Sequence, residues 1–115
     1  MALQINKTVH KSGLSMNGCY IMLVPHLVTG QATVPTDRNI WANKADADAN
    51  PTKGTIPSLD EIADAYYIAN NTAPADCTGA DVLSKALYWI NTQVKAQLLV
   101  ANPTWVDGDI EIVDL

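Results

Sequence analysis

The apolar run from Cys19 to Val24 constrains the fold more than any other part of this 115-residue sequence. Its six apolar residues stand side by side, and the run continues past Pro25 to Leu27 and Val28. Strands that are buried on both faces of a sheet have this composition. A chain of this size has little material to cover both faces. We therefore expect a second subunit to cover one of them.

Two further segments alternate between apolar and polar residues, which is the period of a half-buried strand. Near the start, Leu3, Ile5 and Val9 share one face, with Lys7 as the exception. Near the end, Ile110 and Ile112 share a face in the same way. With a turn at 11–13, the predicted sheet is small and mainly antiparallel, with strands at about 3–9, 16–28, 38–42 and 109–113.

Two helices are predicted in the second half of the chain. Ser58 and Glu61 stand three residues apart in front of an apolar pattern, which is the signature of a capping box and predicts a helix at 58–69. A second apolar stripe at helical spacing predicts a helix at 80–99. This stripe consists of Val82, Leu83, Ala86, Leu87, Ile90 and Val94.

The segment 43–57 holds two prolines and a glycine among small polar residues. It predicts a long loop, with one helical turn at 44–49. Long loops in compact domains are usually functional or mobile, and we expect this one to become ordered on assembly. The chain length suits one domain, residues 1–115. The predicted fold is α+β, with a small, mainly antiparallel sheet packed against two helices.

The net charge is −5, from 7 basic and 12 acidic residues. An acidic chain is a poor ligand for nucleic acid or anionic membrane, so neither is an expected partner. Residues 1–53 carry a net charge of +2 and residues 54–115 carry −7. Such polarity can orient subunits in an assembly. No apolar run has the roughly 20 residues of a membrane-spanning helix, and we expect no signal peptide.

Residues that suggest catalysis are sparse. His10 and His26 stand in no nucleophile motif. All six glycines are isolated, so there is no phosphate-binding loop, and no cysteine or histidine pair has zinc-finger spacing. We expect no enzymatic activity, no catalytic residue and no cofactor. Cys19 and Cys77 are taken as reduced thiols, and the sequence leaves a bridge between them open.

The acidic segment 46–50, Asp-Ala-Asp-Ala-Asn, has the composition of the start of a calcium-binding loop. Such a loop requires glycine at its sixth position and glutamate at its twelfth. Pro51 and Pro57 occupy those positions, so we expect no metal site. A second acidic cluster at 107–111 is better explained by an edge strand, because charges there discourage the addition of foreign strands.

Residues of the apolar strand 19–28 and several aromatic residues are candidates for an interface. They are Tyr20, Met22, Leu23, Trp41, Tyr88, Trp89 and Trp105. An alternative hypothesis is a carbohydrate- or receptor-binding module that uses Trp41, Tyr88 or Trp105. Packing in the core is the simpler interpretation of the same residues.

The opening segment 1–9, MALQINKTV, resembles the start of small structural proteins of tailed-phage virions. Three further features resemble the same group: Tyr20, the segment 44–49 (Lys-Ala-Asp-Ala-Asp-Ala) with its spacing slightly altered, and the pair Ala86 and Tyr88 with a leucine inserted. The resemblance implies a virion protein at the tail tip or baseplate, at a fibre attachment point or on the capsid surface. It further implies contacts with other virion proteins and a homo-oligomer. It assigns no functional residue.

Overall fold

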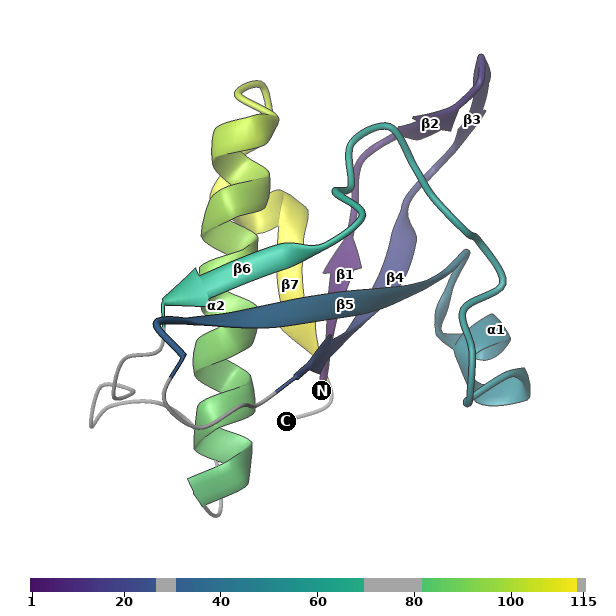
Figure 1. Cartoon of the computed structure of the whole chain (residues 1–115). Helices are drawn as coiled ribbons and strands as arrows, with labels where there is room; N and C mark the ends of the chain where they lie inside the picture. The colour runs from purple at the N-terminus through teal and green to yellow at the C-terminus, as the bar shows by residue number, and fades with distance from the viewer. Residues whose placement is uncertain (27–30, 70–81, 114–115) are drawn as a thin grey trace.

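The computed structural model describes residues 1–26, 31–69 and 82–113. Figure 1 shows its described elements, which are strands, two α-helices and one 3-10 turn. In chain order they are β1 (Ala2–Ile5), β2 (Val9–Lys11), β3 (Leu14–Met16), β4 (Cys19–Pro25), β5 (Thr33–Trp41), α1 (Lys44–Ala49), β6 (Tyr66–Ala69), α2 (Val82–Ala101), the 3-10 turn Asp107–Asp109 and β7 (Ile110–Val113).

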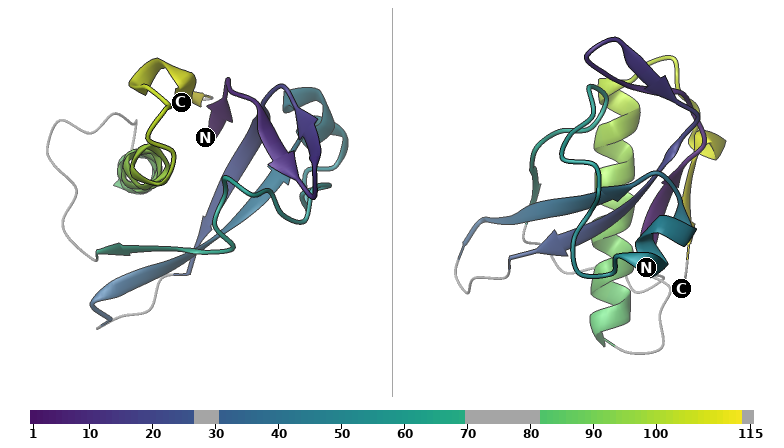
Figure 2. Two further views of the ribbon diagram at one scale, coloured as in Figure 1. Left: turned by 90° about the horizontal axis from the view of Figure 1, so that it is seen from above. Right: turned by 90° about the vertical axis from the view of Figure 1, so that its right-hand side faces the viewer.

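Five of the strands form one antiparallel sheet in the order β6-β5-β4-β1-β7. The sheet curls, and α2 lies within the curl, where it contacts β6, β7 and β1 (Figure 2). The right-handed twist of strands produces such curling. The remaining strands, β2 and β3, form a separate hairpin. The predicted α+β class, with a small antiparallel sheet and two helices, is confirmed.

One hydrophobic core fills the space between the concave face of the sheet and α2. Val94 and Leu98 of α2 are fully buried, as are Leu3, Ile21 and Ile40 on the sheet. Burial of a large apolar side chain contributes about 1.5–3 kcal/mol relative to exposure. The contact between sheet and helix is therefore the main source of stability.

The apolar run of β4 is covered on both faces, as predicted, but largely by its own chain. Ile21 points to the α2 core, and Tyr20 points to the opposite, convex face. There Trp41 and Ala47 of α1 pack beside Tyr20, and the Tyr20 and Trp41 rings lie 6.3 Å apart. At the far end of this face Val24 is 37% exposed.

The expectation that the segment 43–57 becomes ordered only on assembly is wrong. Its first part is α1, which confirms the predicted helical turn and is capped by the Asn43 side chain. Its second part lies along β5: the Gly54 N–H donates to Asn39 Oδ1 (3.0 Å), and Ile56 bridges to Ile40. A Cβ on Gly54 would lie 2.5 Å from the Ile40 nitrogen, so only glycine permits this approach.

The prediction of a helix at 58–69 is also wrong, because its end is the strand β6 and its start forms turns. Leu59 and Ile62 are both buried, and the Ile62 N–H donates to the Leu59 carbonyl (3.1 Å). The carboxylate of Glu61, which a capping box would use inside the helix, binds His10 of β2 instead. Tertiary contacts thus override the local helix signal.

Three strand boundaries differ from the sequence prediction. The first strand ends at Ile5, because residues 6–8 leave the sheet toward the hairpin. The second is divided at Gly18, whose φ of +116° and close approach to the Ile5 carbonyl require glycine. The third, predicted at 38–42, begins at Thr33, because Thr33–Thr36 pair with β6, and pairing with β4 begins at Thr36. The predicted strand 109–113 corresponds to β7.

The helix predicted at 80–99 corresponds to α2, which runs two residues further at its C-terminal end. Residues 80 and 81, and Cys77, lie outside the described residues. The predicted turn at 11–13 is the tip of the β2–β3 hairpin. Ser12 (φ 51°) and Gly13 (φ 84°) both adopt the left-handed conformation that a two-residue hairpin turn requires. The hairpin projects from the sheet (Figure 1).

Trp41→Ala is expected to lower the free energy of unfolding by about 3–5 kcal/mol. The substitution removes a fully buried indole, whose N–H donates to the Asn50 carbonyl (3.1 Å). Urea denaturation followed by circular dichroism measures the change. Val24→Ala on the same face is the matched control and should cost about 1 kcal/mol or less. Equal losses in the two variants would contradict the role of Trp41 in the core.

Candidate functional site

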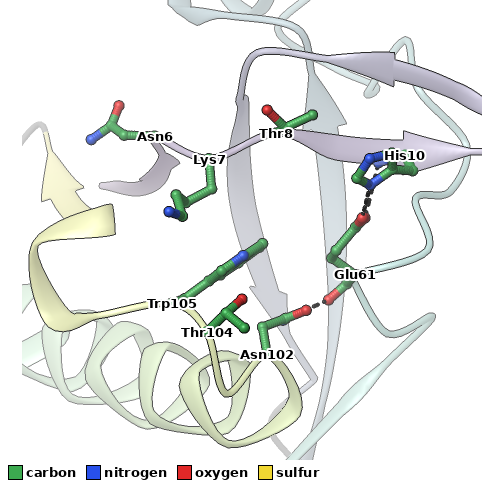
Figure 3. Close-up of a pocket in the computed structure, with 8 residues that line it drawn as sticks. All are labelled: Asn6, Lys7, Thr8, His10, Glu61, Asn102, Thr104 and Trp105. Carbon is green, nitrogen blue, oxygen red and sulfur yellow. Dashed lines mark hydrogen bonds and ion pairs between the residues drawn. The ribbon is translucent and has the colours of Figure 1, made fainter.

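A polar pocket of about 510 Å³ lies beside the base of the hairpin, against the turn before β6 and the segment that follows α2 (Figure 3). Three stretches that are distant in sequence line it. The lining residues are Asn6, Lys7, Thr8, His10, Glu61, Asn102, Thr104 and Trp105. Because they offer an amine, amides, hydroxyls and a histidine–carboxylate pair, the pocket suits a polar ligand.

His10 and Glu61 form the most closely bonded pair in the pocket. The His10 backbone N–H donates to Glu61 Oε2 (2.9 Å), and the His10 ring nitrogen Nδ1 contacts Glu61 Oε1. The Asp60 N–H donates to the His10 carbonyl (2.7 Å), so the turn is bonded to both sides of this residue. These contacts fix the hairpin base against the turn that precedes β6.

The environment of Glu61 acts on its pKa in two directions. Burial of the carboxyl raises the pKa, while the hydrogen bonds from the ring and backbone of His10 lower it. The hydrogen bonds prevail, and the pKa of Glu61 lies below its ordinary value. The carboxylate is therefore the form that the folded chain stabilises.

Other lining residues are held by the structure around them. The Asn102 amide donates to the carbonyls of Glu61 (3.3 Å) and Leu98 (3.0 Å), which ties the end of α2 to the turn. Lys7 lies 3.8 Å from Asp109 Oδ2, a distance at the outer limit of an ion pair. Its amine is therefore loosely held and accessible to a ligand.

Trp105 is only 9% exposed, and its indole belongs to the hydrophobic core. Stacking against a sugar ring requires most of one indole face. Trp105 can therefore contribute an edge to the pocket, but it cannot act as a stacking platform in this structure. Trp41, another candidate for that role, is fully buried.

A histidine–carboxylate pair can serve as a general base when a nucleophile lies within hydrogen-bond reach. In the described part of the chain, no hydrogen bond joins His10 to a serine, threonine or cysteine side chain. Cys19 is buried, which together with the nearby Glu61 raises the pKa of its thiol to about 12. The thiolate is the nucleophilic form of cysteine, so this residue is unreactive at neutral pH.

Within residues 1–26, 31–69 and 82–113, histidine, cysteine, aspartate and glutamate side chains form no cluster of three or more suited to a metal ion. Neither helix of these ranges has both the length and the apolar character needed to cross a membrane.

The interface candidates from the sequence lie in separate places and form no single cluster. Tyr20, Leu23, Trp41 and Trp105 are buried, whereas Met22, Tyr88 and Trp89 are half-buried. The prediction that Trp41 forms a surface contact is wrong, because α1 and β4 of its own chain enclose its side chain. Tyr88 lines a hollow between α2 and β7, and Met22 packs at the edge of the convex cluster.

Sequence reasoning missed the polar pocket and the exposed leucine of the hairpin. Lys7 was a signal for the pocket, because it interrupts the alternation of the first strand. Leu14 follows directly after the turn and is 78% exposed, but its position beside Gly13 indicated only the turn. No family model matches the chain, and no match was found among the curated proteins or the solved structures.

Glu61→Gln is expected to change how stability depends on pH. Because folding lowers the pKa of Glu61, its contribution is complete above the ordinary value of 4.5 and is lost as the pH falls below it. The difference in unfolding free energy between wild type and variant should therefore be largest above about pH 5 and shrink toward about pH 3.

Urea denaturation across that pH range provides the measurement for Glu61→Gln. Glu111→Gln is the control, because the Glu111 side chain is exposed on an edge strand. It should differ little from wild type at either end of the range. A Glu61→Gln difference that stays constant or grows on acidification would contradict the assignment of the His10–Glu61 bonds.

Proposed function

We propose that this chain is a structural component of a tailed-phage virion that acts through protein–protein contacts and not through catalysis. Its place is the tail tip or baseplate, a fibre attachment point or the capsid surface. Its partners are other virion proteins and further copies of itself. The observation that carries the proposal is the anchored β2–β3 hairpin, which presents Leu14 to solvent.

The hairpin is a preorganised arm. Val9 at its base is fully buried in the core, and Met16 packs against the same core from the returning strand. The hydrogen bonds of His10 to the turn before β6 hold the β2 strand of the hairpin in place. Ordering a flexible segment reduces affinity, and an arm that is already ordered avoids this cost. A single exposed leucine is common on protein surfaces, but this one occupies a projecting, fixed position.

Charge supports protein partners. With a net charge of −5, the chain has no excess of lysine and arginine to neutralise phosphates. The hairpin belongs to the half with a net charge of +2, and β7 belongs to the half with −7. Complementary fields of this kind orient subunits that assemble head to tail.

The segment that resembles virion proteins has a defined place in the fold. Residues 1–9 form β1, which lies inside the sheet between β4 and the edge strand β7, and the entry into the hairpin. Ala2, Leu3, Ile5 and Val9 are all buried. The likeness therefore rests on residues that build the scaffold of the arm, which supports a structural role in the virion.

A second candidate function is a carbohydrate- or receptor-binding module, and the polar pocket of Figure 3 is the observation that favours it. Its amides, hydroxyls and amine are the groups that bind hydroxyl-rich ligands. The burial of Trp105 weakens this candidate, because aromatic stacking usually supplies much of the binding energy for sugars.

Leu14→Ser is expected to reduce incorporation of the chain into virions by about tenfold or more, because it removes an apolar contact worth about 1.5–3 kcal/mol when buried. Quantitative peptide mass spectrometry of gradient-purified particles measures the copy number relative to the major capsid protein. The melting temperature of the isolated chain should not change, because Leu14 is exposed.

Val106→Ser is the matched control for this experiment, because Val106 is exposed and lies outside the hairpin. It should be incorporated like wild type. Absence of the wild-type chain from particles would overturn the virion role. Equal incorporation of Leu14→Ser and wild type would leave the virion role intact and exclude the hairpin as the contact.

For the second candidate, a sugar that binds the polar pocket should shift the backbone amide signals of Lys7, Asn102 and Thr104 in a titration followed by NMR. Lys7→Ala should weaken binding without unfolding the chain, because Lys7 is partly exposed and loosely paired. Lys53→Ala, an exposed lysine outside the pocket lining, is the control. Absence of any shift across neutral and acidic glycans would exclude this function.

A further inference from the structure

The outer edge of β7 carries backbone groups that no described strand uses. In the described part of the chain, β7 pairs with β1 alone and ends the sheet. The Asn6 N–H donates to the Asp109 carbonyl (2.8 Å), so Asp109 faces β1. In an antiparallel pair, every second residue faces the partner strand. Glu111 and Val113 therefore also face β1, and Ile110 and Ile112 face outward.

The Ile110 N–H donates to the Asp107 carbonyl within the 3-10 turn, so it is already used. The Ile112 N–H, the Ile112 carbonyl and the Ile110 carbonyl remain along the edge. A residue of an incoming antiparallel strand, placed opposite Ile112, can exchange two hydrogen bonds with it. This edge therefore offers one complete pairing position.

A hollow of about 310 Å³ lies between this edge strand and α2. It is lined by Tyr88, Thr92, Lys95, Ala96, Leu99, Asp107 and Ile112. Leu99 and Ile112 are half-buried and pack against the core, so the floor of the hollow is apolar. A residue paired with Ile112 directs its side chain to the same face as Ile112, which is the face of this hollow. An apolar side chain fits there.

The opposite face of the edge is acidic. Glu111 is exposed on the convex face. Asp107, in the 3-10 turn before the strand, lies on the side of the hollow instead, where its carboxylate is paired with Lys95 (3.1 Å). Residues of an incoming strand that flank the pairing position point to the Glu111 side. A lysine there pairs with the carboxylate, whereas a like charge directly opposite is unfavourable. The edge therefore selects a segment in which basic and apolar residues alternate.

A second copy of β7 fits poorly on this edge. Antiparallel pairing centred on Glu111 would place the two Glu111 side chains opposite each other. Pairing centred on Ile112 would place each Glu111 opposite the partner's Val113, so neither carboxylate would gain a basic partner. The two chains, each with a net charge of −5, would also repel each other. Charge thus argues for a different, basic segment.

We propose that the outer edge of β7 binds an extended segment of alternating basic and apolar residues from a protein partner, which adds to the sheet as a sixth strand. Main-chain hydrogen bonds provide the attachment, and the hollow and Glu111 provide the selection, as in other complexes formed by strand addition. This inference deepens the proposed function and rests on it for the identity of the partner as a protein.

Amide hydrogen exchange of the isolated, full-length chain tests the free edge first. The Glu111 amide is bonded to β1 and the Ile112 amide is not, so Ile112 should exchange at least about tenfold faster than Glu111. Ile112 protected at low chain concentration would overturn the proposal. Protection that appears with rising concentration, together with dimers in sedimentation, would show that a second copy occupies the edge and would also overturn it.

The second step adds a blocked eight-residue peptide of alternating lysine and valine, observed by NMR. Signals of Ile110–Val113, Leu99 and Tyr88 should shift, and the Ile112 amide should become protected. A control peptide of the same length, in which glutamate replaces each lysine, should bind about tenfold more weakly or not at all. N-methylation of the valines, which removes the donors that face Ile112, should abolish binding. Equal binding of these peptides, or shifts at other sites, would overturn the proposal.

Glu111→Lys gives a matched pair of tests, because the position is exposed and the fold is checked in the same spectra. This variant should prefer the glutamate–valine peptide. Asp48→Lys, which makes the same charge change on α1, should keep the wild-type preference. The two proposals can fail independently of each other. Absence of the chain from virions overturns the proposed function, whereas failure of the isolated chain to bind the lysine–valine peptide overturns the proposal for the β7 edge.

Discussion

The contact between α2 and the concave face of the sheet is the interaction on which the rest of the structure depends. The five strands curl around α2, which lies on their concave side in contact with β6, β7 and β1 (Figure 2). Val94 and Leu98 supply the apolar contact, and Gln97 Nε2 donates to the Tyr67 carbonyl (3.2 Å) at the β6 side. Without the helix, the concave face would be open to water.

The same contact positions the polar pocket and supports the hairpin. Because α2 ends at Ala101, the following residues turn back toward the sheet, and Asn102 bonds to the carbonyl of Glu61. Glu61 in turn holds His10 at the base of the hairpin. The arm that projects from the sheet is thus connected through two short steps to the helix in the core. This connection explains how a hairpin of three-residue strands keeps a fixed direction.

Much of the fold follows from local patterns in the sequence. The apolar run predicted β4, the stripe that includes Val94 predicted α2, and Ser12 and Gly13 predicted the hairpin turn. These signals are local, and the tertiary structure agrees with them. The prediction of a helix from the capping box was wrong because the Glu61 carboxylate binds His10, which lies 51 positions earlier in the chain. A local pattern contains no information about such a partner.

The expectation of a covering subunit shows the same limit. Pattern analysis identified correctly that both faces of β4 are covered, but it assigned one face to another chain. Trp41 and Ala47 provide that cover, because the segment after β5 folds back as α1 over Tyr20. The polar pocket was beyond prediction for a related reason. Its residues come from three separated segments, and only the completed fold brings Lys7, Glu61 and Asn102 together.

The acidic character of β7 has two consequences that a single physical cause explains. An exposed glutamate in an edge strand hinders pairing with identical edges, which keeps a free chain from aggregating through its sheet. The same carboxylate favours a partner strand that brings a lysine to that position, because repulsion of one class of partner is also selection of another.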